Sequence, residues 1–184
     1  MTMTIDGTNG ITFPNATTQA LGAGLTLTAS QASTSGTNID FTSIPSWVER
    51  VTVMFNGVST NGTSEVTIQL GTASGFTSSG YLGSCSTTRD AVSPGVTNYS
   101  TGFLIRFGAT VGTATAVRHG VCTFTSYSGN TWVGHTAIGL SNAASNSLGA
   151  GLIALAGALT QIRITTENGT DAFDAGSLNI MYEG

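Results

Sequence analysis

The sequence predicts an all-β protein, an antiparallel β-sandwich of jelly-roll-like type, and three observations support this. Apolar and polar residues alternate in short segments such as Leu25–Ala29 and Val66–Leu70, a period of two that is typical of half-buried strands. Extended runs of good helix formers at helical spacing are missing. Gly and Asn recur between the alternating segments, where they supply the positive φ that tight turns need.

Ten segments alternate in this way, and we expect each to be a strand with one face on the core. Val51, Val53 and Phe55 should point inward. Glu65, Thr67 and Gln69 should face water. The ten segments are 25–29, 39–42, 51–55, 66–70, 103–107, 121–125, 132–138, 152–155, 162–166 and 178–182.

Turn pairs and longer irregular stretches separate the strands. The turn pairs are Asn56-Gly57, Asn61-Gly62, Ser128-Gly129 and Asn168-Gly169. The irregular stretches, rich in Ser, Thr, Asn and Ala, are 71–80, 84–98 and 139–147. Loops of this length are uncommon unless they bind something or are held by a neighbouring chain. Two similar phrases, LGAGL at 21–25 and at 148–152, are interpreted as coincidence because no repeat of fixed period joins them.

Charge is scarce in this chain of 184 residues. Only 8% of the residues are charged, against roughly 25% in an ordinary soluble domain. All five basic residues are Arg and the net charge is -4, which argues against a nucleic-acid partner because no basic face exists to neutralise phosphates. With so few charges to keep a monomer apart in solution, we expect much of the surface to be covered by copies of the same chain.

Hydrophobicity places the chain among folded proteins without membrane insertion. The 40% hydrophobic content is too high for a disordered chain of low net charge. The apolar runs are shorter than the roughly 18 to 20 residues that span a bilayer. The first ten residues, MTMTIDGTNG, lack the basic and apolar regions of a secretory leader.

The first 22 residues differ from the rest, so we divide the chain into an N-terminal segment, 1–22, and a sandwich domain, 23–184. Ile5, Ile11 and Phe13 are the large apolar residues of the first twenty positions besides methionines, and Pro14 closes this part. These few side chains cannot form a core. The segment should therefore become ordered by docking on a partner or by intertwining with copies of itself.

Catalytic chemistry has little support, and we expect no catalytic residue, metal or cofactor. His119 and His135 lie in strand patterns and no G-x-S-x-G motif occurs, so both are interpreted as ordinary strand residues. The acids Glu167, Asp171 and Asp174 could offer oxygen ligands to Ca²⁺, but their spacing matches no EF-hand loop. A structural loop is the favoured interpretation.

The two cysteines, Cys85 and Cys122, have no metal-ligand spacing and are too few for a disulfide scaffold. Two buried free thiols are the expected state, with a single bridge left open as the alternative.

The aromatic residues suggest a candidate glycan site at Tyr127, Asn130 and Trp132. An exposed Trp beside Tyr and Asn can stack on a sugar ring while its neighbours bind the hydroxyls. Packing in the core is nevertheless the favoured interpretation for Trp132, and also for Trp47, which follows Pro45-Ser46 at a strand entry.

Two stretches carry a family resemblance. The segment IDGTNGITFPNATTQ, 5–19, resembles the G-x-x-G-[IL]-x-F-P-[DN]-x-[ST]-x-Q segment of tail fibre and related virion proteins of tailed bacteriophages. Residues 39–71, which contain IPSWVERVTVMFNGVSTNG, and the final stretch 159–184 are similar to the C-terminal β-sandwich module of such fibres. Residues 72–158 match nothing.

The resemblance implies a homotrimeric virion protein, assembled in the host cytoplasm. Its N-terminal segment, with Ile5, Ile11, Phe13 and Pro14, would attach to other virion proteins of the tail or capsid, and distal loops would touch a cell-surface glycan. The leading prediction is a short tail fibre. Because the chain begins almost at the motif and has no long shaft, a capsid-bound decoration protein or head fibre is the alternative. The third candidate function is a sugar-cleaving or carbohydrate-binding enzyme module, which needs carboxylates in a cleft.

Overall fold

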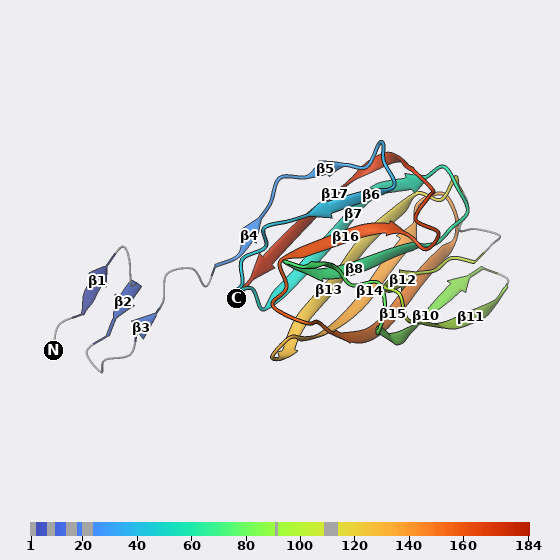
Figure 1. Ribbon diagram of the computed structural model, residues 1–184. Helices are drawn as coiled ribbons and strands as arrows, with labels where there is room; N and C mark the ends of the chain where they lie inside the picture. The colour runs from blue at the N-terminus through green and yellow to red at the C-terminus, as the bar shows by residue number, and fades with distance from the viewer. Residues whose placement is uncertain (1–2, 7–9, 14–17, 20–23, 91, 109–113) are drawn as a thin grey trace.

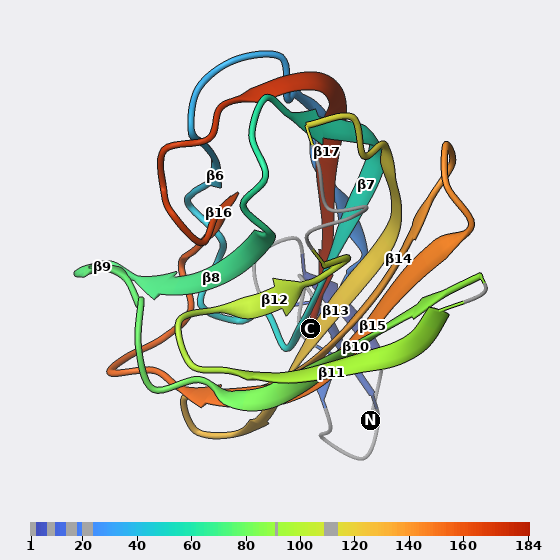
Figure 2. The same cartoon turned by 90° about the vertical axis from the view of Figure 1, so that its right-hand side faces the viewer.

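The computed structural model describes residues 3–6, 10–13, 18–19, 24–90, 92–108 and 114–184. These residues form strands, turns and loops without a helix, and every pair of hydrogen-bonded strands is antiparallel. Two large sheets pack face to face (Figures 1 and 2), so the predicted all-β antiparallel sandwich is confirmed. No helix long and apolar enough to cross a bilayer is found in these ranges.

The larger sheet has nine strands in the order β11-β10-β15-β14-β13-β7-β17-β4, with β5 also pairing to β17. Figure 2 shows that it curves around one side of the molecule. Its strands are β4 (Thr26–Leu27), β5 (Gln31–Ala32), β7 (Arg50–Thr60), β10 (Leu82–Arg89), β11 (Val92–Tyr99), β13 (Arg118–Ser128), β14 (Thr131–Leu140), β15 (Ser145–Ala154) and β17 (Phe173–Glu183).

The smaller sheet has five strands in the order β12-β8-β16-β6, with β9 paired to β8. Its strands are β6 (Asn38–Phe41), β8 (Val66–Thr72), β9 (Gly75–Phe76), β12 (Phe103–Ile105) and β16 (Gln161–Thr166). Consecutive strands such as β7 and β8 belong to different sheets, so the chain crosses between the layers repeatedly.

The core lies between the inner faces of the two sheets. Val51, Val53 and Phe55 of β7 are buried, as predicted. Phe103 of β12 stands at the centre, with its ring 4.7 Å from that of Phe124 and 5.3 Å from that of Tyr81. Burying each such side chain contributes about 1.5 to 3 kcal/mol, and this layer holds the sheets together.

A third, small sheet precedes the sandwich. It consists of β1 (Thr4–Asp6), β2 (Gly10–Thr12) and β3 (Thr18–Gln19). Figure 1 shows it standing off the end of the sandwich where the C-terminus lies. The predicted boundary at residue 22 lies outside the described residues.

The prediction of irregular structure is wrong for two stretches of the chain. Residues 84–98 form most of the β10–β11 hairpin, and in 139–147 only 141–144 separate β14 from β15. The sequence of β10 does not alternate clearly between polar and apolar residues, because its buried inward positions are occupied by the small residues Cys85 and Thr87. Pairing with β15 along all eight residues satisfies its backbone nevertheless.

Two of the predicted turn pairs have other roles. Asn56-Gly57 lies inside β7 at a bulge, where Gly57 has φ +69° and the pairing register shifts. Asn168-Gly169 is a turn, but it joins β16 to β17 in different sheets and makes no hairpin. Ser128-Gly129 does close a hairpin, between β13 and β14.

The predicted solvent exposure of Glu65 and Thr67 is also wrong. Thr67 is buried because the segment entering β12 covers it: a Cβ placed on Gly102 would lie 2.3 Å from Thr67 Oγ1. The Glu65 carboxylate turns back to the chain and accepts hydrogen bonds from the backbone N–H groups of Phe107 and Gly108 at 2.9 and 2.6 Å.

Strand β4 reverses its predicted orientation. Leu25 and Leu27 are 64% and 62% exposed, whereas Thr26 and Thr28 turn toward the protein. Thr28 donates to Asn179 Oδ1 at 2.5 Å, and its carbonyl accepts from the Asn179 side chain. These hydrogen bonds to β17 fix the threonine side inward and leave the leucine side outward.

Candidate functional site

The N-terminal segment brings together two of its four predicted attachment residues. Ile5 of β1 pairs directly with Ile11 of β2. Phe13 follows β2 and is exposed, as is Met3 before β1. Pro14 lies outside the described residues. The leading sheet therefore carries exposed apolar side chains on a body separate from the sandwich core.

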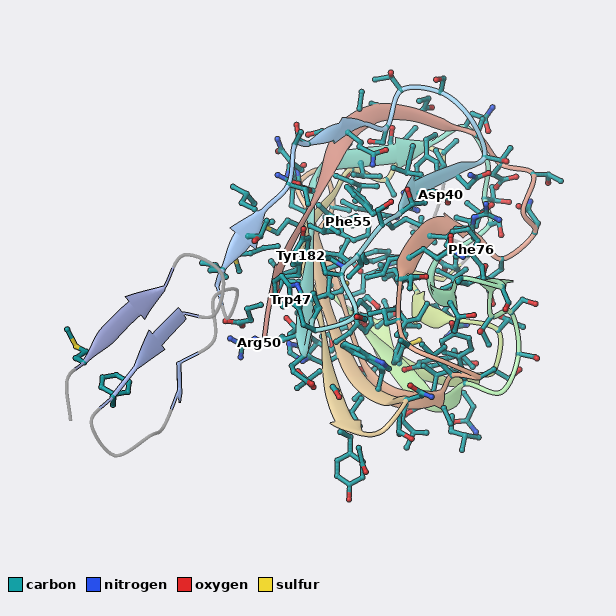
Figure 3. The ribbon with its side chains drawn as sticks, turned by 60° about the vertical axis from the view of Figure 1, so that its left-hand side comes forward. Asp40, Trp47, Arg50, Phe55, Phe76 and Tyr182 are labelled. Atoms are coloured by element: carbon teal, nitrogen blue, oxygen red, sulfur yellow. The ribbon has the colours of Figure 1, made fainter. Side chains whose placement is uncertain are left out.

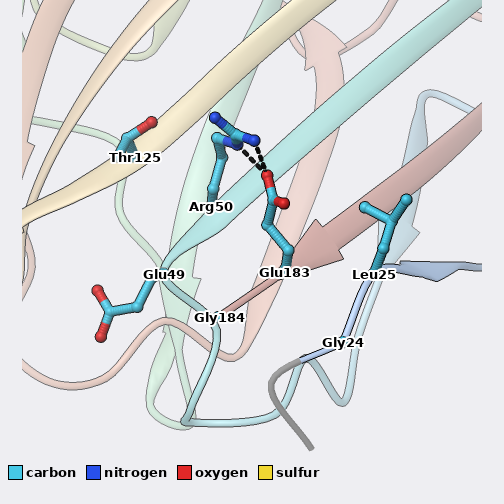
Figure 4. Close-up of a pocket in the computed structure, with 7 residues that line it drawn as sticks. All are labelled: Gly24, Leu25, Glu49, Arg50, Thr125, Glu183 and Gly184. Carbon is cyan, nitrogen blue, oxygen red and sulfur yellow. Dashed lines mark hydrogen bonds and ion pairs between the residues drawn. The ribbon is translucent and has the colours of Figure 1, made fainter.

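This segment enters the sandwich beside a shallow hollow of about 250 Å³ (Figure 4). The Arg50 guanidinium and the Glu183 carboxylate form a hydrogen-bonded ion pair at its wall. The hollow is lined by Gly24, Leu25, Glu49, Arg50, Thr125, Glu183 and Gly184. Both termini of the sandwich thus meet at one end.

Trp47 lies near the same end, with its ring 5.9 Å from that of Tyr182 (Figure 3). It is 42% exposed, so the prediction that Trp47 packs in the core is wrong. The reason is its place in a turn before β7, with Tyr182 covering one side of the indole only.

The candidate glycan site at the β13–β14 hairpin tip is divided by the fold. Tyr127 is 75% exposed, and Asn130 is exposed. Trp132 is 4% exposed and belongs to the core, where it is paired between Ser126 and Ile153. The prediction of Trp132 as a sugar-stacking residue is therefore wrong. A bulge at Tyr127 shifts the register here and turns this side chain away from the inner face.

The β13–β14 and β10–β11 hairpins of the nine-stranded sheet turn at opposite ends (Figure 1). Thr125, two residues before Tyr127, lines the hollow near the N-terminal segment. The β10–β11 hairpin turns at the other end, where Arg89 pairs with Ser145 and the Asp90 N–H donates to the Ala144 carbonyl. The turn of residues 141–144, between β14 and β15, lies at this same end, away from the leading sheet.

A buried arginine that the sequence analysis did not predict as special lies in the interior, with Glu65 near enough to affect its pKa. Arg118 is fully buried, and its Nε and Nη2 groups have no hydrogen-bond partner. Burial lowers the pKa of Arg118, and the nearby Glu65 opposes this. The pKa of Glu65 is itself raised by burial, although its two backbone hydrogen bonds and Arg118 act in the other direction.

The other titratable side chains are spread through the structure. His119 and His135 lie in β13 and β14, as expected, and His119 Nδ1 accepts a hydrogen bond from the Gly57 N–H at 3.2 Å. Asp171 accepts from the Ser64 N–H at 2.8 Å, and Asp174 accepts from a serine hydroxyl. In the described ranges, no three His, Cys, Asp or Glu side chains gather closely enough to hold a metal ion.

Cys85 and Cys122 are free and buried, as predicted, and the alternative of a bridge is wrong. Strands β15 and β14 separate them, which places them about 14 Å apart across the sheet, beyond the reach of a disulfide. Burial raises the pKa of both thiols, that of Cys85 to about 11.

The outer face of the nine-stranded sheet carries apolar side chains that sequence reasoning missed. Exposed residues on it are Leu82, Val96, Val121, Val133 and Leu148. The phrase at 148–152 contained a signal for them, because its large and small residues alternate even though its polar and apolar residues do not.

Neither a family model, a curated protein nor a solved structure matches this chain. The resemblance to phage fibres therefore remains a prediction.

Proposed function

We propose that this protein is a structural virion protein of a tailed bacteriophage, a short homotrimeric tail fibre of jelly-roll-like sandwiches. The observation that carries the proposal is the leading three-stranded sheet, which has exposed Phe13 and lies apart from the sandwich. Its sequence is also the one that resembles fibre proteins. The leading sheet attaches to other virion proteins, and no reaction or cofactor is part of the proposal.

The orientation of the sandwich supports a host-facing role for its opposite end. When the N-terminal segment is bound to the particle, the Tyr127 hairpin tip faces the particle too. The turns that carry Asp90 and residues 141–144 then face outward. These turns, rather than Tyr127 and Asn130, are the proposed surface for contact with a host glycan.

Deleting residues 1–19 tests the attachment role. The truncated chain should keep the sandwich spectrum in circular dichroism, because its core is complete without those residues. It should be absent from purified particles when it replaces the full chain during infection. A point variant, Phe13→Ser, should reduce incorporation, with Thr12→Ser as the matched control. Incorporation of the truncated chain at the normal level would contradict the proposal.

The alternative is a capsid-bound decoration protein or head fibre. It is favoured because few residues of the sequence separate the end of β3 from the start of β4, which leaves no room for a long fibre shaft between them. Copy number separates the two functions. A count comparable to the number of capsid subunits indicates decoration, whereas a small multiple of three at the tail indicates a fibre. Labelling the protein on intact particles by electron microscopy gives both the count and the position.

A further inference from the structure

We propose that the outer face of the nine-stranded sheet is the surface on which neighbouring copies of this chain pack. Apolar side chains stand in register across it. One row crosses six neighbouring strands through Val96, Ser86, Leu148, Ala137, Val121 and Met54. A second row joins Leu82, Leu152 and Val133. Three members of the first row, Val96, Val121 and Leu148, are exposed to solvent in the single chain.

Strand β15 has both of its leucines, Leu148 and Leu152, on the side that an isolated sandwich would leave in water, and only Ile153 of its large apolar residues points into the core. Leu148 is 52% exposed, while Gly149 and Gly151 face inward. The inner space is taken by other side chains: a Cβ on Gly151 would lie 2.5 Å from Tyr99 Oη, and one on Gly149 would lie 2.8 Å from Thr136 Oγ1. Since leucine gains free energy by leaving water, its outward placement indicates a covered face.

The absence of charge on this face selects the kind of partner. The outward positions of 82–88, 121–125, 133–139 and 146–154 contain no Asp, Glu, Lys or Arg, and His135 is their one titratable group. Arg50 and Glu183 at the border neutralise each other. A phosphate, an acidic peptide or a lipid headgroup would find no counter-charge here. A second copy of the chain presents a matching neutral apolar surface.

The size of the face is adequate for a stable contact. From β11 to β17 the sheet is about 29 Å wide, and eight residues of strand are about 26 Å long. The product, about 750 Å², is close to the roughly 800 Å² that each partner contributes to an interface of standard size. The depletion of charged residues around a central apolar row is also the feature of composition that marks the core of an interface.

The expectation of three copies rests on the proposed function as a trimeric fibre. The assignment of the outer face of the nine-stranded sheet as the contact between copies does not depend on that function. Light scattering of the full chain should show an oligomer. Leu148→Arg should raise the concentration of half-dissociation at least about a hundredfold, because it places an unpaired charge inside the contact. Thr42→Arg, exposed just after β6 on the other sheet, is the matched control and should change nothing. Circular dichroism checks that both variants fold.

Cross-linking gives a second, independent test. Leu148→Cys should yield covalent oligomers with a short bismaleimide, and Thr42→Cys should not. The two native thiols are buried and unreactive, so the introduced thiol reports the contact. A wild-type chain that is monomeric at about 100 μM, far above the dissociation constant of a standard interface, would overturn the inference, as would unchanged assembly of Leu148→Arg without cross-linking. A dimer, or absence from particles, would contradict the proposed function and leave this inference standing.

Discussion

The two sheets share one core, yet their outer faces differ in which contacts their side chains make within the chain. On the five-stranded sheet, Arg163 donates two hydrogen bonds to Asp40 at 2.8 and 2.7 Å and lies 4.1 Å from the centre of the Phe76 ring (Figure 3). On the nine-stranded sheet, Leu148 and Val121 remain 52% and 42% exposed to solvent. On the nine-stranded face the charged pair Arg50–Glu183 lies only at the border, so the central strands of this face carry no charge, which fits the proposed packing of copies on it.

The largest expected effect concerns the inner face of the nine-stranded sheet. Trp132→Ala should lower the free energy of unfolding by about 3 to 5 kcal/mol, since it removes a large buried side chain and leaves a cavity. The melting temperature, followed by circular dichroism, should fall by roughly 10 °C or more. A variant as stable as the wild type would show that Trp132 lies outside the core and would restore it as a candidate for sugar stacking.

The next effect tests why β15 turns its leucines outward. Gly151→Ala should cost about 1 to 3 kcal/mol, because the new Cβ would lie 2.5 Å from Tyr99 Oη and 2.6 Å from the Leu82 carbonyl oxygen. Ala150→Ser, at the adjacent outward position, should change stability by less than about 0.5 kcal/mol. Chemical denaturation measures both. Equal effects at the two positions would refute the assignment of inner and outer sides.

Glu65 gives a pH-dependent prediction. Burial raises its folded pKa above the ordinary value of 4.5, so the folded protein holds this proton more tightly than the unfolded chain. The stabilising contribution of this group is therefore complete below pH 4.5 and is lost as the pH rises through the raised folded pKa.

The neutral variant Glu65→Gln keeps an oxygen that can accept from Phe107 and Gly108. Its stability relative to the wild type should therefore increase between about pH 4 and 7, by about 1 kcal/mol. Denaturation curves at several pH values measure this difference. A difference that stays flat or decreases with pH would show that the carboxylate is well solvated or strongly paired with Arg118.

The sequence predicted the strands that alternate in polarity and missed those that alternate in size. Val51, Val53 and Phe55 were placed correctly because every second residue is apolar. At residues 83–87 of β10 and 147–151 of β15 the inward positions are Cys, Ser, Thr and Gly, so polarity patterns predicted a loop or gave no clear result there. The missing information was non-local: Tyr99, on a third strand, fills the space that those small residues leave.

Prediction of the candidate site from the sequence was limited in the same way. Sequence alone identified the N-terminal segment, because its few apolar residues cannot make a core. It did not distinguish Trp47 from Trp132, because the side of the sheet on which an aromatic ring lies depends on register, and the bulge at Tyr127 shifts that register by one residue. The buried Glu65 was missed because the chain entering and leaving β12 covers it.

A smaller effect is expected on the five-stranded face. Arg163→Ala removes the paired hydrogen bonds to Asp40 and the stacking on Phe76, and it should cost about 1 kcal/mol because the pair is partly exposed. Arg50→Ala, which breaks the more exposed pair with Glu183, should cost less. Neither the stoichiometry nor the concentration of half-dissociation should change for Arg163→Ala. Loss of assembly in this variant would move the contact between copies to the five-stranded sheet.

The smallest effect on stability is expected at the hairpin tip, where Tyr127 lies five residues from Trp132 but on the solvent side. Tyr127→Ala should change the free energy of unfolding by less than about 0.5 kcal/mol, since most of the side chain is already in water. Because the tip faces the end that bears the N-terminal segment, particles carrying this variant should adsorb to host cells at the wild-type rate. Asp90→Ala, at the opposite end, should slow adsorption. The reverse result would place host contact at the tip and would require the sandwich to be mounted with its β10–β11 end toward the particle.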